Sequence, residues 1–134
     1  MIKYIQWLCI LCMLILPTIG LAQVEEWVAR YNGPGNSYDA AFDMVLDNEG
    51  NIYVTGGSAG SGTSYDYATV KYNASGVEQW VARYNGPGND LDWAHDIVVD
   101  DAGNVHVTGE SWGSGASYDY ATVKYDASGV EQWV

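Results

Sequence analysis

Two short segments of the chain have the spacing of a catalytic serine motif. Residues 56–60 and 109–113 both have the form Gly-x-Ser-x-Gly, which presents a nucleophilic serine in one class of hydrolase. That chemistry needs a strand–turn–helix around the serine and a histidine base, and no helical pattern follows either segment. We therefore interpret both segments as flexible Gly/Ser-rich loops and predict no serine hydrolase.

Acidic residues gather in tight turns, and oxygen-rich turns can bind calcium. A contiguous calcium loop places a bidentate Glu at its twelfth position. Counting from Asp47 and from Asp100, that position holds Ser58 and Ser111. The sequence therefore favours hairpin turns capped by Asp or Asn, and we expect no cofactor. A calcium site assembled from several loops stays open as an alternative.

The two histidines have no cluster of metal-ligating neighbours. His95 and His106 are accompanied by no nearby Cys, and a lone pair of histidines is weak evidence for a metal. We interpret both as strand residues.

Aromatic side chains beside carboxylates offer a different chemistry. Flat rings stack on sugars or peptides, and carboxylate oxygens accept their hydrogen bonds. The alternative is that the same rings pack between structural repeats. The candidate ligand-binding residues are Tyr38, Asp39, Tyr65, Asp66, Asp90, Asp92, Trp93, Trp112, Tyr118 and Asp119.

Composition excludes several kinds of partner. The net charge of the 134 residues is −12, which argues against nucleic acid and against anionic lipid surfaces. Hydrophobic residues make up 48% of the chain, so it is not a disordered acidic tail. We expect a protein or glycan ligand.

The first 22 residues predict a secretory signal peptide. Lys3 is followed by an apolar run that ends at Pro17, and cleavage is expected after Ala22. A retained membrane anchor is the alternative, but the apolar run is too short to span a bilayer. Both cysteines, Cys9 and Cys12, lie inside this signal, so the mature chain 23–134 is expected to be extracellular, acidic and free of disulfides.

The rest of the chain is one unit copied. The segment Trp27–Asn36 recurs unchanged as Trp80–Asn89, and Trp133 begins a third copy at the same spacing. This divides the chain into repeats 27–79 and 80–132 and the start of a third at 133–134. Such a period indicates an architecture in which each unit buries its faces against its neighbours.

Each unit predicts four short antiparallel strands. In the first unit the strands are expected over 41–47, 51–56, 67–72 and 77–84, with a Gly/Ser-rich loop over 57–66. Four such strands per unit are typical of a β-propeller blade, and a β-solenoid or a sandwich is the alternative. The predicted fold is all-β, with about two blades of an incomplete propeller. A strand at Trp27 is expected to pair with the last blade.

Three segments carry a family resemblance. Two of them, residues 45–56 and 98–109, resemble the signature of the bacterial seven-bladed β-propeller repeat proteins. The first copy has the sequence Val-Leu-Asp-Asn-Glu-Gly-Asn-Ile-Tyr-Val-Thr-Gly. Residues 66–76 match the next hairpin of the same family. The resemblance implies a secreted or surface module that binds or supports other molecules, and it supplies no catalytic residue. Six-bladed families have a similar core, so the blade number stays open.

The blade geometry would gather the candidate residues. The loop between strands two and three and the loop to the next blade leave a four-stranded antiparallel blade at the same end, where binding residues are commonly found. We therefore predict a non-catalytic binding or structural module. The alternatives are a carbohydrate-active glycosidase or lyase using Asp90 and Asp92, and a surface spacer. Open blade edges are expected to promote self-association.

The first strand differs between the copies only at alternate positions. Period two would place the constant residues on one face and the variable ones on the other. We therefore expect Val45 and Val98 to lie in similar environments, and Phe42 and His95 to lie in different ones.

Overall fold

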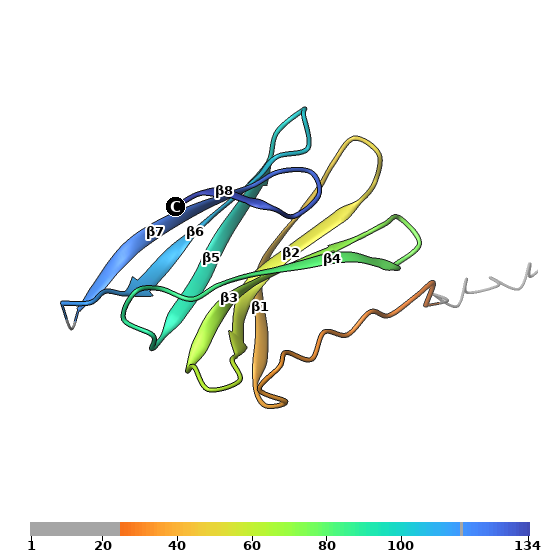
Figure 1. The fold of residues 1–134 in the computed structure, drawn as a ribbon. Coiled ribbons are helices and arrows are strands. Elements are labelled where there is room, and N and C mark those ends of the chain that lie inside the picture. The colour runs from red at the N-terminus through yellow and green to blue at the C-terminus, as the bar shows by residue number, and fades with distance from the viewer. Residues whose placement is uncertain (1–24, 116) are drawn as a thin grey trace, which may run out of the picture.

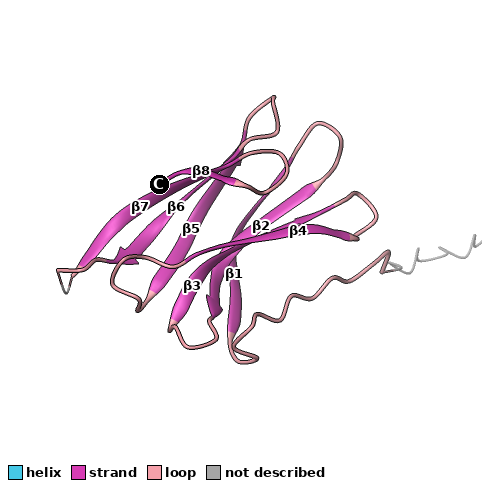
Figure 2. Cartoon of the chain, in the orientation of Figure 1, coloured by secondary structure: helices cyan, strands magenta, loops and turns pink. Residues whose placement is uncertain are grey.

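The structure, a computed structural model, describes residues 25–115 and 117–134. The predicted signal peptide therefore lies outside the described residues. Every regular element in the described chain is a strand, as Figure 2 shows. The strands are β1 (Asp39–Leu46), β2 (Ile52–Ala59), β3 (Tyr65–Tyr72), β4 (Glu78–Tyr84), β5 (Asp92–Val99), β6 (Val105–Trp112), β7 (Tyr118–Tyr125) and β8 (Glu131–Trp133).

The strands form two antiparallel four-stranded sheets, which confirms the predicted fold class. The first sheet has the order β1-β2-β3-β4 and the second has the order β5-β6-β7-β8. Each sheet is an up-and-down meander of the kind that forms a propeller blade. Figure 1 shows the two sheets facing each other, with the tight hairpin turns at one end and the longer connections at the other.

The hairpin turns are built by Asp or Asn and closed by Gly. The Asp47 carboxylate accepts hydrogen bonds from the backbone N–H groups of Glu49 and Asn51, both at 2.9 Å. Gly50 has a φ of +80°, a left-handed conformation that costs a glycine little. The turns that begin at Asn73, Asp100 and Asp126 repeat this arrangement. Local turn chemistry therefore sets the register of these four hairpins.

The predicted Gly/Ser-rich loop is shorter than expected. β2 continues to Ala59 and β3 begins at Tyr65, because Gly57 and Ser58 pair with residues of β3 in the ladder. A side chain at Gly57 would collide with the ring of Trp93 from the second sheet. Glycine is therefore present here to let an aromatic ring approach the strand.

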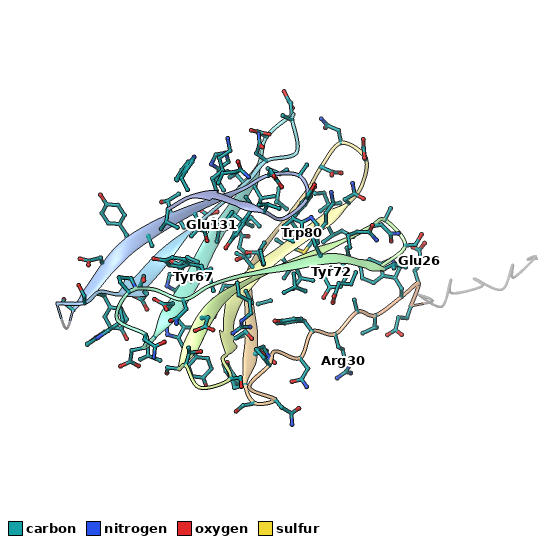
Figure 3. The ribbon with its side chains drawn as sticks, viewed as in Figure 1. Glu26, Arg30, Tyr67, Tyr72, Trp80 and Glu131 are labelled. Carbon is teal, nitrogen blue, oxygen red and sulfur yellow. The ribbon has the colours of Figure 1, made fainter. Side chains whose placement is uncertain are left out.

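The core lies between the two sheets. Tyr53 and Tyr67 of the first sheet are fully buried against Val105, Val107 and Tyr125 of the second. Three hydrogen bonds cross the interface, including one from Tyr67 Oη to the Ala121 carbonyl at 3.3 Å. Figure 3 shows Tyr67 between the sheets. Stacking of like units thus supplies the core that one sheet alone would lack.

The lead-in segment, residues 25–38, crosses the other face of the first sheet. It forms no strand, so the prediction of a strand at Trp27 is wrong for this structure. A strand needs a hydrogen-bonding neighbour, and this segment lies over the sheet's face, with Trp27 against Gly76. Between the segment and the sheet runs a groove of about 880 Å³, lined mainly by apolar residues such as Met44, Val54 and Tyr72.

The expected likeness of Val45 and Val98 is also wrong. Val45 packs against the core, whereas Val98 is 56% exposed. The second sheet covers the face on which Val45 lies, and among the described residues no sheet covers the corresponding face at Val98. Phe42 and His95 were expected to lie in different environments, but both are exposed and their ring centroids are 5.6 Å apart.

A β-bulge also interrupts the period of two, at the same position in both copies. The register shifts between Ala41 and Asp43 in β1 and between Ala94 and Asp96 in β5. The bulge residues are therefore Phe42 and His95, and a bulge redirects side chains along its strand.

Candidate functional site

A row of aromatic rings joins the two sheets at their loop end. Tyr38 packs edge to face on Tyr65 with 6.0 Å between the ring centroids, and Tyr65 stacks on Trp93 with 4.5 Å between the ring centroids. Trp93 then lies 5.7 Å from Phe42, which lies 5.6 Å from His95. We call these five residues the aromatic row. Three of its members, Tyr38, Tyr65 and Trp93, were predicted from the sequence as ligand-binding residues.

The sequence analysis missed Phe42 and His95 as members of the row. Both are bulge residues on the first strand of their sheets, β1 and β5, which pack beside one another. No sequence pattern marked the bulge that places them in the row. His95 Nε2 also lies 3.8 Å from a Glu110 carboxylate oxygen, which places an acceptor beside the end of the row.

The row combines packed and accessible rings. Tyr65 and Trp93 are partly buried, and their stacking holds them in place. Tyr38 and Phe42 are 58% and 48% exposed, so ring surface is open to solvent on both sides of the stacked pair. Rigid rings with exposed surface suit stacking against a flat ligand.

Two of the predicted carboxylates hold loops in place. Asp39 accepts a hydrogen bond from the Gly33 N–H at 3.0 Å, and Asp92 accepts one from Gly86 at 2.8 Å. Asp92 is fully buried and its other oxygen accepts from the Trp112 N–H at 3.0 Å. Both oxygens of Asp92 are therefore engaged by backbone donors, which suits loop anchoring.

Asp66 belongs to a buried polar cluster. Arg83 donates to Asp66 at 2.9 Å and also to the Ser58 hydroxyl and carbonyl. A fourth bond runs from Arg83 to the Tyr31 hydroxyl at 3.0 Å. Burial alone would lower the pKa of Arg83, but its hydrogen bonds to Asp66 and Tyr31 outweigh burial and raise that pKa above its ordinary value. Asp66 is therefore a partner of Arg83 in the structure.

The remaining predicted residues belong to the second repeat and lie outside the row. Trp112 and Tyr118 meet edge to face at 4.8 Å, and they adjoin no ring of the aromatic row in the described interactions. Asp90 and Asp119 are exposed. The structure thus divides the predicted residues into the row, this second pair, the loop-anchoring Asp39 and Asp92, the Arg83-bound Asp66, and the exposed Asp90 and Asp119.

The serines of the Gly-x-Ser-x-Gly segments lie inside strands. Ser58 and Ser111 are in β2 and β6, and both are buried. A nucleophile elbow needs an exposed serine on a turn, so these positions do not meet its geometry.

The turn end carries a second, acidic hollow. A cavity of about 300 Å³ lies between the β1–β2 and β5–β6 turns and is lined by Asp47, Glu49, Asp100 and Asp101. Across the described residues, no three His, Cys, Asp or Glu side chains are close enough together to hold a metal ion. No helix in that part of the chain is long and apolar enough to cross a membrane.

Comparison with known families supports the architecture. Residues 79–115 match the family model described as SBBP, beta-propeller repeat. The matched segment covers most of β4, all of β5 and β6, and the connections between them. The chain therefore carries a β-propeller repeat, and its two sheets have the form of propeller blades. A comparison with curated proteins found no match.

Proposed function

We propose that this chain is a secreted, non-catalytic β-propeller module that binds carbohydrate through the aromatic row. As part of the same proposal, we place it with the bacterial seven-bladed repeat proteins that its segments resemble. The predicted signal at residues 1–22 supports secretion. The observation that carries the binding role is the continuous row of five rings across both sheets.

Carbohydrate suits the row better than other ligands for two reasons. Sugar rings present apolar faces that stack on aromatic rings, and Tyr38 and Phe42 offer exposed ring surface. Sugar hydroxyl groups also donate to carboxylates, and Glu110 lies at the end of the row beside His95. A net charge of −12 favours neutral glycans over acidic ones.

The test is a glycan panel followed by calorimetric titration of the best ligand. Tyr38→Ala should weaken binding by about tenfold, as expected for loss of an exposed stacking ring. Tyr120→Ala is the matched control, because Tyr120 is an exposed tyrosine of β7 outside the row. If Tyr120→Ala weakens binding as much as Tyr38→Ala, the row is not the site.

The same panel separates binding from catalysis. A glycosidase or lyase would release product from a panel member, and Asp90→Asn should then abolish release. We expect no product. Product formation that disappears in Asp90→Asn would replace the binding proposal with the enzymatic one.

A further inference from the structure

The aromatic row has accessible rings on either side of a more buried middle. Tyr38 and Phe42 are exposed, and each packs on one member of the central pair. The central rings, Tyr65 and Trp93, are partly buried and stack on each other. A ligand therefore meets open ring surface at two places in the row, with the stacked pair between them.

The stacked pair is held in place by its neighbours. The six-membered ring of Trp93 lies against Gly57 of β2, where any side chain would collide with it. Tyr65 holds the same ring by stacking on it. Close packing of this kind confines the ring. The pair therefore acts as a fixed spacer between the two accessible rings.

The strand ladder gives the spacing of the two accessible rings. The Tyr38 carbonyl accepts a hydrogen bond from the Ala59 N–H at 3.2 Å, so Tyr38 lies beside the end of β2. Phe42 lies in the bulge that follows the pairing of Ala41 with Gly56. Positions 59 and 56 are three residues apart on β2, which corresponds to about 10 Å along the strand. This separation is longer than a single sugar ring.

The two accessible rings also belong to one extended stretch of chain. Tyr38 directly precedes β1, and Phe42 lies within it. Tyr65 comes from β3 and Trp93 from β5, so the row bridges the two sheets between these rings. A ligand that reaches both accessible rings must run along β1, and an unbranched chain has the shape to do so.

Two separate stacking contacts favour a ligand that can make both at once. One stacked ring alone gives weak binding. A chain already stacked on one ring makes its second contact within the complex, at a high effective concentration. The spacing of the rings therefore favours a chain whose first and third sugar units stack, with one unit between them.

We propose that the ligand of the aromatic row is a linear, neutral oligosaccharide of at least three units, with one sugar stacked on Tyr38 and another on Phe42. The inference rests on the proposed carbohydrate-binding function of the row, and it adds the length and form of the ligand. The unit between the stacked sugars passes over the Tyr65–Trp93 pair. His95, whose ring centroid is 5.6 Å from that of Phe42, extends the row for a longer chain.

The first test is the dependence of affinity on chain length. The probes are oligomers of one to six units of the neutral sugar that binds best in the glycan panel, such as cello- or malto-oligosaccharides for a glucan. Calorimetric titration gives each dissociation constant. The trisaccharide should bind about tenfold more tightly than the monosaccharide, because it is the shortest chain that reaches both rings. The disaccharide should resemble the monosaccharide.

The second test removes one ring at a time. Tyr38→Ala and Phe42→Leu should each weaken hexasaccharide binding by about tenfold, to the level of a single stacking contact. Each should weaken monosaccharide binding by at most about twofold, because the other ring still binds it. Phe42→Leu keeps an apolar side chain at the bulge, and circular dichroism checks that both variants fold.

The matched control is Tyr118→Ala. Tyr118 is an exposed tyrosine that packs on Trp112 outside the row, so its loss should leave both affinities unchanged. Equal affinity for the monosaccharide and the hexasaccharide, or hexasaccharide binding that Phe42→Leu does not weaken, would overturn this inference and leave the proposed function in place. Failure of every panel member to bind would overturn both.

Discussion

The first and second sheets are built from almost the same residues, yet they differ in what surrounds them. Both have four antiparallel strands, the same bulge and the same turn chemistry. Tyr67 of the first sheet is fully buried, whereas the equivalent Tyr120 is 89% exposed. The difference shows that the burial of a residue in a repeat is set by its neighbouring unit as much as by its own strand.

The loop ends differ in a second way. In the first sheet Tyr65 stacks on Trp93 of its neighbour, and the stack extends to Tyr38 and Phe42. In the second sheet Tyr118 contacts only Trp112 of its own sheet among the described aromatic pairs. The aromatic row therefore exists where two units meet, and a single unit would not form it.

Replacing the two equivalent tyrosines should give the largest contrast. Tyr67→Ala should lower the free energy of unfolding by about 3–5 kcal/mol, because it empties a fully buried aromatic position. Tyr120→Ala should change it by less than about 0.5 kcal/mol, because that ring is exposed. Urea denaturation at concentrations where the chain is monomeric measures both. Equal losses would mean that the sheets do not stack as described.

The two arginines should give a smaller contrast. Arg83→Gln should cost about 3 kcal/mol, since it leaves the buried Asp66 carboxylate without its cation. Arg30→Gln should cost less than about 0.5 kcal/mol in the monomer, because Arg30 is exposed. Thermal unfolding followed by circular dichroism checks the pair. A large loss for Arg30→Gln in the monomer would show an internal partner for that side chain.

The third contrast depends on pH. Burial raises the pKa of Tyr67 and Tyr125 in the folded chain above the ordinary value of 10.0. Above pH 10.0 the unfolded chain therefore loses protons that the folded chain keeps, and stability falls as pH rises. Tyr125→Phe should make this fall shallower by about 1.4 kcal/mol per pH unit, the contribution of one proton.

The control for this contrast is the exposed tyrosine. Tyr120→Phe should leave the alkaline slope unchanged, because its ring is solvated in both states. The Tyr125 hydroxyl is buried with no hydrogen-bond partner in the described structure, so Tyr125→Phe should not lower stability at neutral pH. Urea titrations between pH 7 and pH 11 give the slopes. An unchanged slope in Tyr125→Phe would contradict the burial of this hydroxyl.

Much of the fold could be predicted from local signals. Turn residues such as Asp47 and Gly50 act within their own hairpin, so the sequence alone locates each turn. The sequence repeat also predicted two like units, because equivalent residues form equivalent strands and turns. The extent of β2 was missed, because Gly57 and Ser58 have the composition of a loop and become strand residues only through their pairing with β3.

The candidate site was predicted only in part for a similar reason. Tyr38, Tyr65 and Trp93 could be selected by residue type and loop position. Phe42 and His95 depend on a β-bulge, and no sequence pattern announced that bulge. The anchoring role of Asp92 depends on backbone donors from the β4–β5 connection and from the end of β6, which only the folded chain brings together.

The central claim is that ligand binds at the row between the sheets and not at the pair within the second sheet. Tryptophan fluorescence tests it directly, by titrating the best glycan of the panel into wild type, Trp93→Phe and Trp112→Phe. We predict an emission change on binding that is lost in Trp93→Phe and kept in Trp112→Phe. A change that survives in Trp93→Phe and disappears in Trp112→Phe would contradict the account.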